Sequence, residues 1–137
     1  MRLEITRKTD LAVRALCSLS QHERVKGSQL AKWAETSQAF MAQVLAPLVQ
    51  AGWVDSEPGP TGGYRLVADV SALSMLEVIE AIEGPTDNGR CVLRAGPCPA
   101  DQNCALHDAW QPARDALMAR LADTPVSSAC ASSGLLH

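Results

Sequence analysis

The chain contains 137 residues, a length that fits one domain with a substantial buried core. Hydrophobic residues make up 47% and charged residues 20% of the sequence, which excludes a wholly disordered chain. Twelve Lys and Arg against 15 Asp and Glu give a formal net charge of −3, and at first this balance argues against a nucleic-acid partner.

The opening segment, residues 1–8, is charged throughout and lacks the apolar run of a signal peptide. No stretch of the sequence is long and apolar enough to span a bilayer, so we expect a cytoplasmic protein without a membrane partner. In a reducing compartment, cysteines favour metal or redox chemistry over disulfides. The five cysteines are unevenly distributed, with three in one segment and two apart from it: Cys91, Cys98 and Cys104, then Cys17 and Cys130.

The first predicted helix begins near Thr9, which suits the N-cap position. Asp10 then lies favourably at the positive end of the helix dipole. Cys17 falls within this helix and is interpreted as a small packed side chain. Apolar residues recur at helical spacing on one face, at Ala12, Ala15, Leu16 and Leu19.

Two short helices are predicted next. Ser28 caps the first, over residues 29–35, and Ser37 caps the second, which stops at Gly52. Two short helices joined by a tight turn are typical of a helix-turn-helix. Pro47 predicts a kink in the second helix, because proline has no N–H to donate.

A β-hairpin is expected after these helices. Residues 53–57 and 63–67 are short extended runs, and the segment between them, 58–62, is rich in turn residues. A hairpin placed directly after a helix-turn-helix is a wing. A capping box at Ser74 then starts another helix, which Gly84 ends.

The last predicted helix runs to about Ala122 and carries an apolar stripe at Leu106, Trp110, Ala113, Leu117 and Leu121. Such a stripe packs into a core or against a second copy, and Trp110 favours a dimer seam. The predicted fold is therefore mainly α, a winged helix-turn-helix with a two-stranded wing and a long C-terminal dimerisation helix. We expect four regions: the winged helix-turn-helix 1–84, a cysteine-bearing loop 85–107, a dimerisation helix 108–125 and a flexible tail 126–137.

The loop carries the strongest chemical motif, Cys91-x6-Cys98-x5-Cys104, followed by His107. Structural zinc sites favour two closely spaced pairs, which this spacing does not provide. Thiolates also suit iron–sulfur clusters, whose iron accepts a non-thiolate ligand. The remaining alternative is a flexible loop whose thiols are incidental.

Charge is unevenly distributed along the chain. Residues 1–32 carry seven basic and three acidic side chains, a net +4, whereas residues 71–137 carry four basic and eight acidic ones, a net −4. A basic N-terminal region suits DNA phosphates. A winged helix-turn-helix reads DNA more often than not, and the alternative is a module that binds only proteins.

Three segments resemble the IscR/NsrR/RirA group of iron–sulfur winged-helix transcriptional regulators. They are Met1-Arg2-Leu3 with residues 9–16, the wing segment Gly59-Pro60-Thr61-Gly62-Gly63-Tyr64, and the cysteine trio with residues 104–110. The resemblance implies a homodimer with a long antiparallel dimerisation helix, a palindromic double-stranded DNA operator and an iron–sulfur cluster. It implies that nitric oxide, oxidants or iron shortage change DNA affinity through that cluster.

The resemblance also implies the ligands. Cys91, Cys98 and Cys104 match the family's cysteine ligands. His107 matches the position of a 2Fe–2S ligand in IscR-like members, and Asp10 matches a carboxylate that the partner subunit supplies to a 4Fe–4S cluster in NsrR-like members. Both residues are present, so the cluster type and its fourth ligand stay open.

The predicted DNA-contacting residues lie at the N-terminus, at the start of each of the two short helices and in the wing. They are Arg2, Ser28, Gln29, Ser37, Gln38, Phe40, Gln43, Thr61, Gly62 and Tyr64.

The sequence thus predicts a DNA-binding regulator, and more specifically a repressor, with an iron–sulfur cluster as its sensor. The alternatives are a cofactor-free or thiol-switch regulator of the same fold, and a protein-binding module that regulates an enzyme. We expect no enzymatic activity, because no base and nucleophile pair is recognisable.

Overall fold

The computed structural model describes residues 2–93, 96–98 and 104–132. Within these ranges no helix is long and apolar enough to cross a membrane. The elements in chain order are α1 (Arg7–Ser20), α2 (Gly27–Trp33), α3 (Gln38–Gln50), β1 (Val54–Glu57), β2 (Gly63–Leu66), α4 (Met75–Glu83), α5 (His107–Ala122) and α6 (Val126–Cys130).

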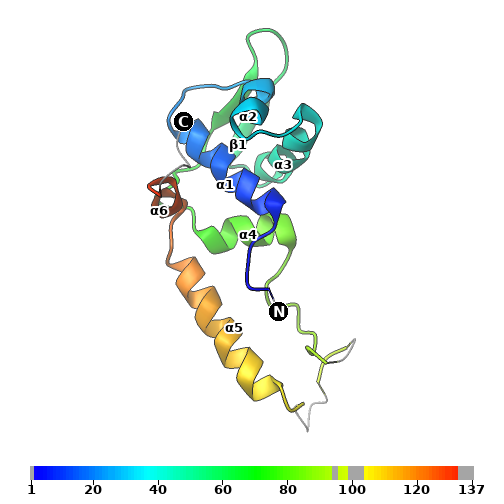
Figure 1. Cartoon of the computed structure of the whole chain (residues 1–137). Helices are drawn as coiled ribbons and strands as arrows, with labels where there is room; N and C mark the ends of the chain where they lie inside the picture. The colour runs from blue at the N-terminus through cyan, green and yellow to red at the C-terminus, as the bar shows by residue number, and fades with distance from the viewer. Residues whose placement is uncertain (1, 94–95, 99–103, 133–137) are drawn as a thin grey trace.

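The elements form a compact head from which one long helix projects (Figure 1). Helices α1, α2 and α3 and the β1–β2 hairpin make up the head, α4 crosses beneath it, and α5 extends away. Helix α6 returns to pack on α1. The wing and the cysteine-bearing loop lie at opposite ends of the molecule (Figure 1). The mainly α winged helix-turn-helix predicted from the sequence is confirmed.

Two of the predicted serine caps are confirmed. The Ser37 hydroxyl accepts a hydrogen bond from the Phe40 N–H at 3.1 Å and starts α3. At the start of α4, Ser74 Oγ accepts from the Glu77 N–H at 3.1 Å and the Glu77 carboxylate accepts from the Ser74 N–H at 2.8 Å. Both caps satisfy backbone donors within their own segment, so local sequence suffices to predict them.

The other two predicted helix starts were wrong. Helix α1 begins one turn earlier, because Thr6 rather than Thr9 is the cap, and Thr9 is fully buried inside the helix. Helix α2 is preceded by Lys26, and the predicted cap Ser28 lies within it. The start of α2 is set by a contact with the wing. Val25 and Tyr64 exchange backbone hydrogen bonds of 2.9 and 2.7 Å, which hold the chain in an extended conformation just before α2.

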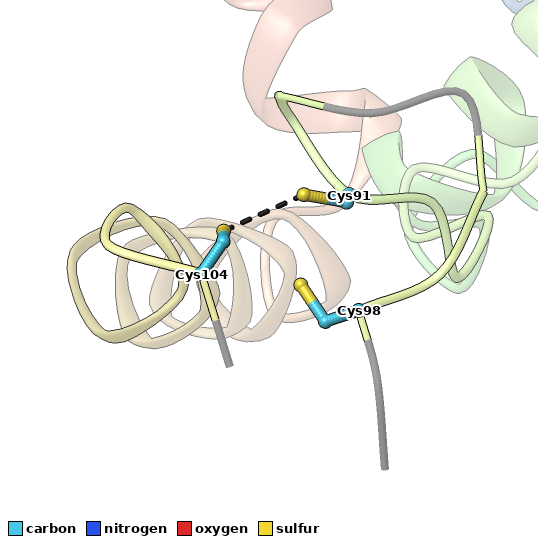
Figure 2. Close-up of side chains that lie close together, drawn as sticks. All are labelled: Cys91, Cys98 and Cys104. Carbon is cyan, nitrogen blue, oxygen red and sulfur yellow. Dashed lines mark hydrogen bonds between the residues drawn. The ribbon is translucent and has the colours of Figure 1, made fainter. Parts of the chain in front are cut away.

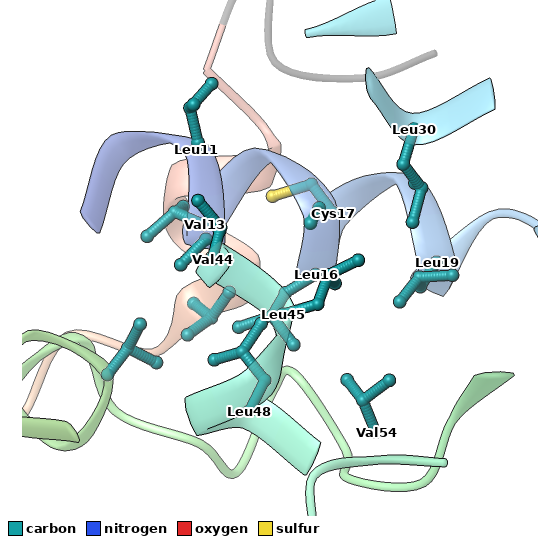
Figure 3. Close-up of a cluster of buried hydrophobic side chains, with 14 of the residues drawn as sticks. Leu11, Val13, Leu16, Cys17, Leu19, Leu30, Val44, Leu45, Leu48 and Val54 are labelled. Carbon is teal, nitrogen blue, oxygen red and sulfur yellow. The ribbon is translucent and has the colours of Figure 1, made fainter. Parts of the chain in front are cut away.

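The core lies between α1 and α3 (Figure 3). Helix α3 carries an apolar stripe at helical spacing that is almost completely buried, with exposed fractions of 0–1% at Met41, Val44, Leu45 and Leu48. Helix α3 continues through Pro47 to Gln50. Strands β1 and β2 pair antiparallel, with Val54 opposite Leu66 and Glu57 opposite Gly63, so the wing is hinged directly on the core through buried Val54.

The C-terminal segment differs from the predicted flexible tail. Residues 126–130 form α6, and Val126 is fully buried against the core. The Val126 and Ser127 N–H groups donate to the carbonyls of Leu73 and Val70 at 2.8 and 2.9 Å. The tail composition of Ser and Ala concealed these long-range contacts, and residues 133–137 lie outside the described part.

The interpretation of Cys17 as a packed thiol was incomplete. Cys17 is fully buried in α1, but it forms a disulfide with Cys130 of α6, and the two Cα atoms lie 5.3 Å apart. The bond joins residues 113 positions apart, so no local pattern could predict it.

Because Val126 is fully buried and Val67 is 51% exposed, we expect Val126→Ala to lower the free energy of unfolding by about 2 kcal/mol. Val67→Ala is the matched control and is expected to change it by less than about 0.5 kcal/mol. Denaturant unfolding followed by circular dichroism measures both values. Equal effects of the two substitutions would show that α6 does not belong to the core.

Candidate functional site

Three thiols converge at the end of the molecule away from the wing (Figure 2). The Sγ atoms of Cys91, Cys98 and Cys104 all lie within 4.8 Å of one another, and each side chain is half-buried. Cys91 Sγ and Cys104 Sγ are 3.4 Å apart. The structure therefore brings together the three cysteines that the sequence singled out.

Backbone contacts position these thiols. The Cys91 N–H donates to the Gly96 carbonyl at 2.9 Å, which folds the loop back on itself. The Leu93 N–H donates to Cys91 Sγ at 3.3 Å and so holds that sulfur in place. Cys104 lies three residues before α5, and its carbonyl accepts from the His107 N–H at 3.1 Å. All three thiols therefore come from the loop, and the last of them lies in the turn that leads into α5.

A cavity of about 320 Å³ lies beside the thiols. Helix α5 lines one wall with a single face, because residues spaced by three and four positions share a side of a helix. The lining includes all three cysteines, and the α5 residues are His107, Trp110, Gln111 and Arg114. His107 thus lines the cavity beside the thiols, but it is not part of the group of ligand atoms within 4.8 Å among the described residues.

The donor set suits a thiophilic metal centre. Sulfur atoms are the ligands preferred by iron–sulfur clusters and by zinc, and three of them converge here without a carboxylate among them. The backbone N–H of Cys104 acts to lower the pKa of the Cys98 thiol, but the Cys91 thiol, burial and the Cys104 thiol together raise that pKa above its usual value. Crowded thiols that resist ionising beside one another gain from a cation that neutralises them.

Asp87 anchors the loop to α5. Its carboxylate accepts hydrogen bonds from Gln111 Nε2 at 3.0 Å, from the Gly89 N–H at 3.0 Å and from Arg114, whose guanidinium lies 3.4 Å away. The Gln111 side chain and the Gly89 N–H have the largest effects and lower the pKa of Asp87; burial opposes them, and the positive charge of Arg114 lowers the pKa further. The loop is thus fastened four residues before Cys91.

Sequence reasoning missed this anchor. Gln111 and Arg114 lie four and seven positions after His107, the spacing of one helix face, and this periodicity was the available signal. It was obscured because Trp110, which lines the same cavity, was assigned to the apolar stripe of a dimer seam.

Asp10 lies on α1, in a different part of the chain from the thiols. Its carboxylate pairs with Arg14 at 3.1 Å and with Arg7 at 3.3 Å, and its side chain is 29% exposed. It is not among the residues that line the thiol cavity. Within one chain, the structure therefore does not bring Asp10 to the cysteines.

A second candidate surface lies at the opposite end, between α2, α3 and the wing. A groove of about 380 Å³ runs between the starts of α2 and α3 and the hairpin, and its lining includes Lys26, Ser28, Gln38, Gly62 and Tyr64. Gln43 is exposed on the first half of α3. The geometry places exposed polar side chains of a short helix beside a wing, as in proteins that read DNA.

The other predicted DNA-contacting residues differ in exposure. Ser28, Ser37, Thr61 and Arg2 are exposed, and Gln29 is half-buried. Phe40 is half-buried and packs against the core, so only part of its ring faces outwards.

The wing depends on glycine at its tip. Gly62 is buried, and a Cβ there would collide with the carbonyl oxygens of Glu57 and Pro58. Tyr64 is half-buried and lies against Gly27, where a Cβ would be 3.2 Å from the tyrosine ring. These contacts close the hairpin tightly and seat it against the start of α2.

Ion pairs hold the wing to the head. Arg24, which lies before α2, pairs with Glu57 of β1 at 3.0 Å and donates to the Thr61 carbonyl at 3.4 Å. Arg65 pairs with Asp55 across the hairpin at 2.8 Å. Both acidic residues of β1 are thus neutralised locally, which reduces the repulsion that this face presents to a polyanion.

Removing the Asp87 anchor is expected to loosen the loop. In Asp87→Ala, the amides of residues 87–93 should exchange with deuterium about 5-fold faster, because hydrogen bonds to a charged group are lost. Since the pKa of Asp87 is lowered, the anchor is intact at neutral pH and should weaken only as the pH falls below about 4. Asp123→Ala, at an exposed aspartate that follows α5, serves as the control, and equal exchange in both variants would contradict the anchor.

Comparison with known proteins identifies the family. Residues 5–131 match the Rrf2 family, described as iron-dependent transcriptional regulators. The HTH-type transcriptional regulator IscR of Vibrio vulnificus is 33% identical over 112 residues, which cover 80% of this chain and 66% of that protein. The chain thus spans just under two thirds of the length of this relative.

Solved structures share the fold. CymR, the global cysteine regulator of B. subtilis, superposes with a TM-score of 0.76 at 23% identity, covering 94% of this chain and 97% of CymR. IscR of T. potens superposes with a TM-score of 0.71 at 21% identity, covering 93% of this chain and 85% of that one. The family consists of transcriptional regulators and not of enzymes, as the sequence predicted. With residues 5–131 matched, the chain belongs to the Rrf2 family of transcriptional regulators.

Proposed function

We propose that this regulator represses transcription and that an iron–sulfur cluster held by Cys91, Cys98 and Cys104 controls its affinity for operator DNA. The observation that carries the proposal is the convergence of three half-buried Sγ atoms within 4.8 Å on the loop that leads into α5. The description of the family as iron-dependent supports an iron centre.

Within one chain, His107 is the candidate for the fourth ligand, because it lines the cavity beside the thiols. The alternative is Asp10 of the partner subunit, whose carboxylate is held by two arginines in this chain. Imidazole and carboxylate both bind iron, and the family resemblance associates His107 with a 2Fe–2S cluster and Asp10 with a 4Fe–4S cluster.

We further propose a homodimer on a palindromic operator. None of the described residues of α5 is buried, and Trp110 and Leu117 expose 36% and 45% of their surfaces. A second copy of α5 laid alongside would cover this apolar face and place two copies of α3 for two half-sites.

The cluster, when bound, supplies iron–sulfur bonds that nitric oxide, oxidants and iron shortage disrupt. The chain's own residues transmit the change. Asp87 ties the loop to Gln111 and Arg114 of α5, and the segment after α5 is hydrogen-bonded to the start of α4, with the Met75 N–H donating to the Thr124 carbonyl at 2.8 Å. Ordering of the loop therefore biases the position of α5 relative to α3, which is a shift between two populations.

There are two alternatives, and the geometry of the thiols supports the first. Cys91 Sγ and Cys104 Sγ lie 3.4 Å apart, so a small movement joins them in a disulfide and makes the loop a direct thiol switch. A protein-binding module of the same fold would bind genomic DNA fragments weakly and without a steep dependence on salt.

Replacing one ligand should abolish the cluster. We expect Cys98→Ser, purified without oxygen, to lose at least about 90% of the iron and acid-labile sulfide found in the parent protein, because the change removes one of the three thiolates that the site offers. Cys130→Ser removes a cysteine outside the site and should retain both. His107→Ala and Asp10→Ala, analysed by absorption and electron paramagnetic resonance spectroscopy, identify the fourth ligand.

A colourless, iron-free parent protein that binds its operator fully would overturn the proposal. If it also gains a Cys91–Cys104 disulfide on oxidation, with a change in DNA affinity, the thiol switch replaces it.

Substitutions on the DNA-binding face should distinguish residues that contact bases from residues that contact phosphates. We expect Gln43→Ala to weaken operator binding about 5- to 100-fold and to relax base preference, because an amide reads a base edge. Lys26→Ala should weaken binding to all sequences and reduce the salt dependence by about one ion. Gln50→Ala, at the other end of α3, is the matched control, and an effect as large as that of Gln43→Ala would refute the assignment.

A further inference from the structure

The two cysteines outside the loop have no role in the proposed cluster. Cys17 is fully buried on α1 among apolar side chains (Figure 3), and Cys130, on α6, is 6% exposed. Their disulfide is separate from the group formed by the other three thiols. The protein therefore contains two distinct sulfur sites, one half-buried in a loop and one within the core.

We propose that Cys17 and Cys130 form a reversible disulfide that fastens α6 to α1 and gives the protein a second redox site, independent of the loop cysteines. The reaction partner is a low-molecular-weight disulfide of the glutathione type. This inference does not depend on the presence of a cluster.

The position of α6 explains what the disulfide would stabilise. The start of α6 is already held without it, because Val126 is buried and hydrogen-bonded to the Leu73 carbonyl. The end of α6, which carries Cys130, is held by the disulfide and by packing against α1. Since α6 follows α5 after three residues, the bond tightens the joint between α5 and the head.

The same arrangement gives a route for exchange. Opening of the last turn of α6 exposes Cys130 while Val126 stays buried, and short terminal helices open at low cost. The Cys130 thiolate then attacks the low-molecular-weight disulfide, forms a mixed disulfide and releases one thiolate. On reclosing, the Cys17 thiolate attacks Cys130 Sγ, forms the Sγ–Sγ bond and releases the second thiolate. The two protons lost by the protein thiols are taken up by the two released thiolates, so the protein is oxidised by two electrons and the small disulfide is reduced by two.

Peptide mapping tests this chemistry directly. Trypsin cleaves after Arg14, Arg24 and Arg120, so Cys17 and Cys130 fall in peptides 15–24 and 121–137, apart from the loop cysteines in 91–94 and 95–114. We expect native protein equilibrated with oxidised glutathione and then alkylated to yield the linked pair 15–24/121–137. In reduced glutathione, the same pair should be alkylated at both cysteines. Absence of the linked pair in oxidised glutathione, or its persistence in reduced glutathione, overturns the proposal.

Thermal unfolding measures the consequence. In a variant with Cys91, Cys98 and Cys104 all changed to Ser, reduction should lower the melting temperature by about 5–15 °C, because the bond closes a long loop in the unfolded chain. Adding Cys130→Ser to this variant should remove the dependence on reductant. A melting temperature that reduction leaves unchanged in the first variant overturns the proposal, and peptide mapping of the parent protein decides the matter if the variant does not fold.

Discussion

Burial of α1 is the constraint on which the rest of the structure depends. Nine of its fourteen residues are buried, on more than one face, so it cannot lie at a surface like an ordinary amphipathic helix. Helices α3, α4 and α6 and strand β2 all pack on it. Its start is fixed from α4, because the Glu83 carboxylate accepts hydrogen bonds from the Thr6 N–H at 3.2 Å and from the Thr9 hydroxyl at 2.5 Å. The position of the wing, of α3 and of the segment that follows α5 therefore depends on how α1 is enclosed.

Helix α5 is the opposite case and shows why the two ends of the molecule can communicate. It contributes no buried residue among those described, so it is less firmly embedded than α1. It packs against α4, Asp87 ties its first half to the cysteine-bearing loop, and backbone hydrogen bonds hold the segment that follows it around Thr124. An element without buried residues shifts more readily than one embedded in a core, so a change at the loop can reach the other end of α5.

The sequence predicted most of what is encoded locally and little of what is encoded by distant contacts. Ser37 and Ser74 cap their helices because each cap and its backbone donor lie three residues apart. The prediction that Ser28 caps α2 was wrong, because the start of α2 is set by a strand contact between Val25 and Tyr64, 39 residues further along the chain. The thiol trio was predictable from spacing, since its members lie in one loop, whereas its support by Gln111 and Arg114 required knowing which face of α5 the loop covers.

The five cysteines show that burial, and not residue type, decides which reactions a side chain can undergo. In the loop, half-buried sulfurs sit beside a cavity of about 320 Å³ and can accept an added centre. In the core, Cys17 and Cys130 lie where close packing leaves no such space, so the reaction open to them is with each other. An oxidant meets the loop thiols first, because the core pair becomes accessible only when α6 opens. The chain thereby contains one sulfur site that an oxidant reaches directly and one that it reaches only after α6 opens. The core pair therefore responds only to oxidising conditions that last long enough for α6 to open.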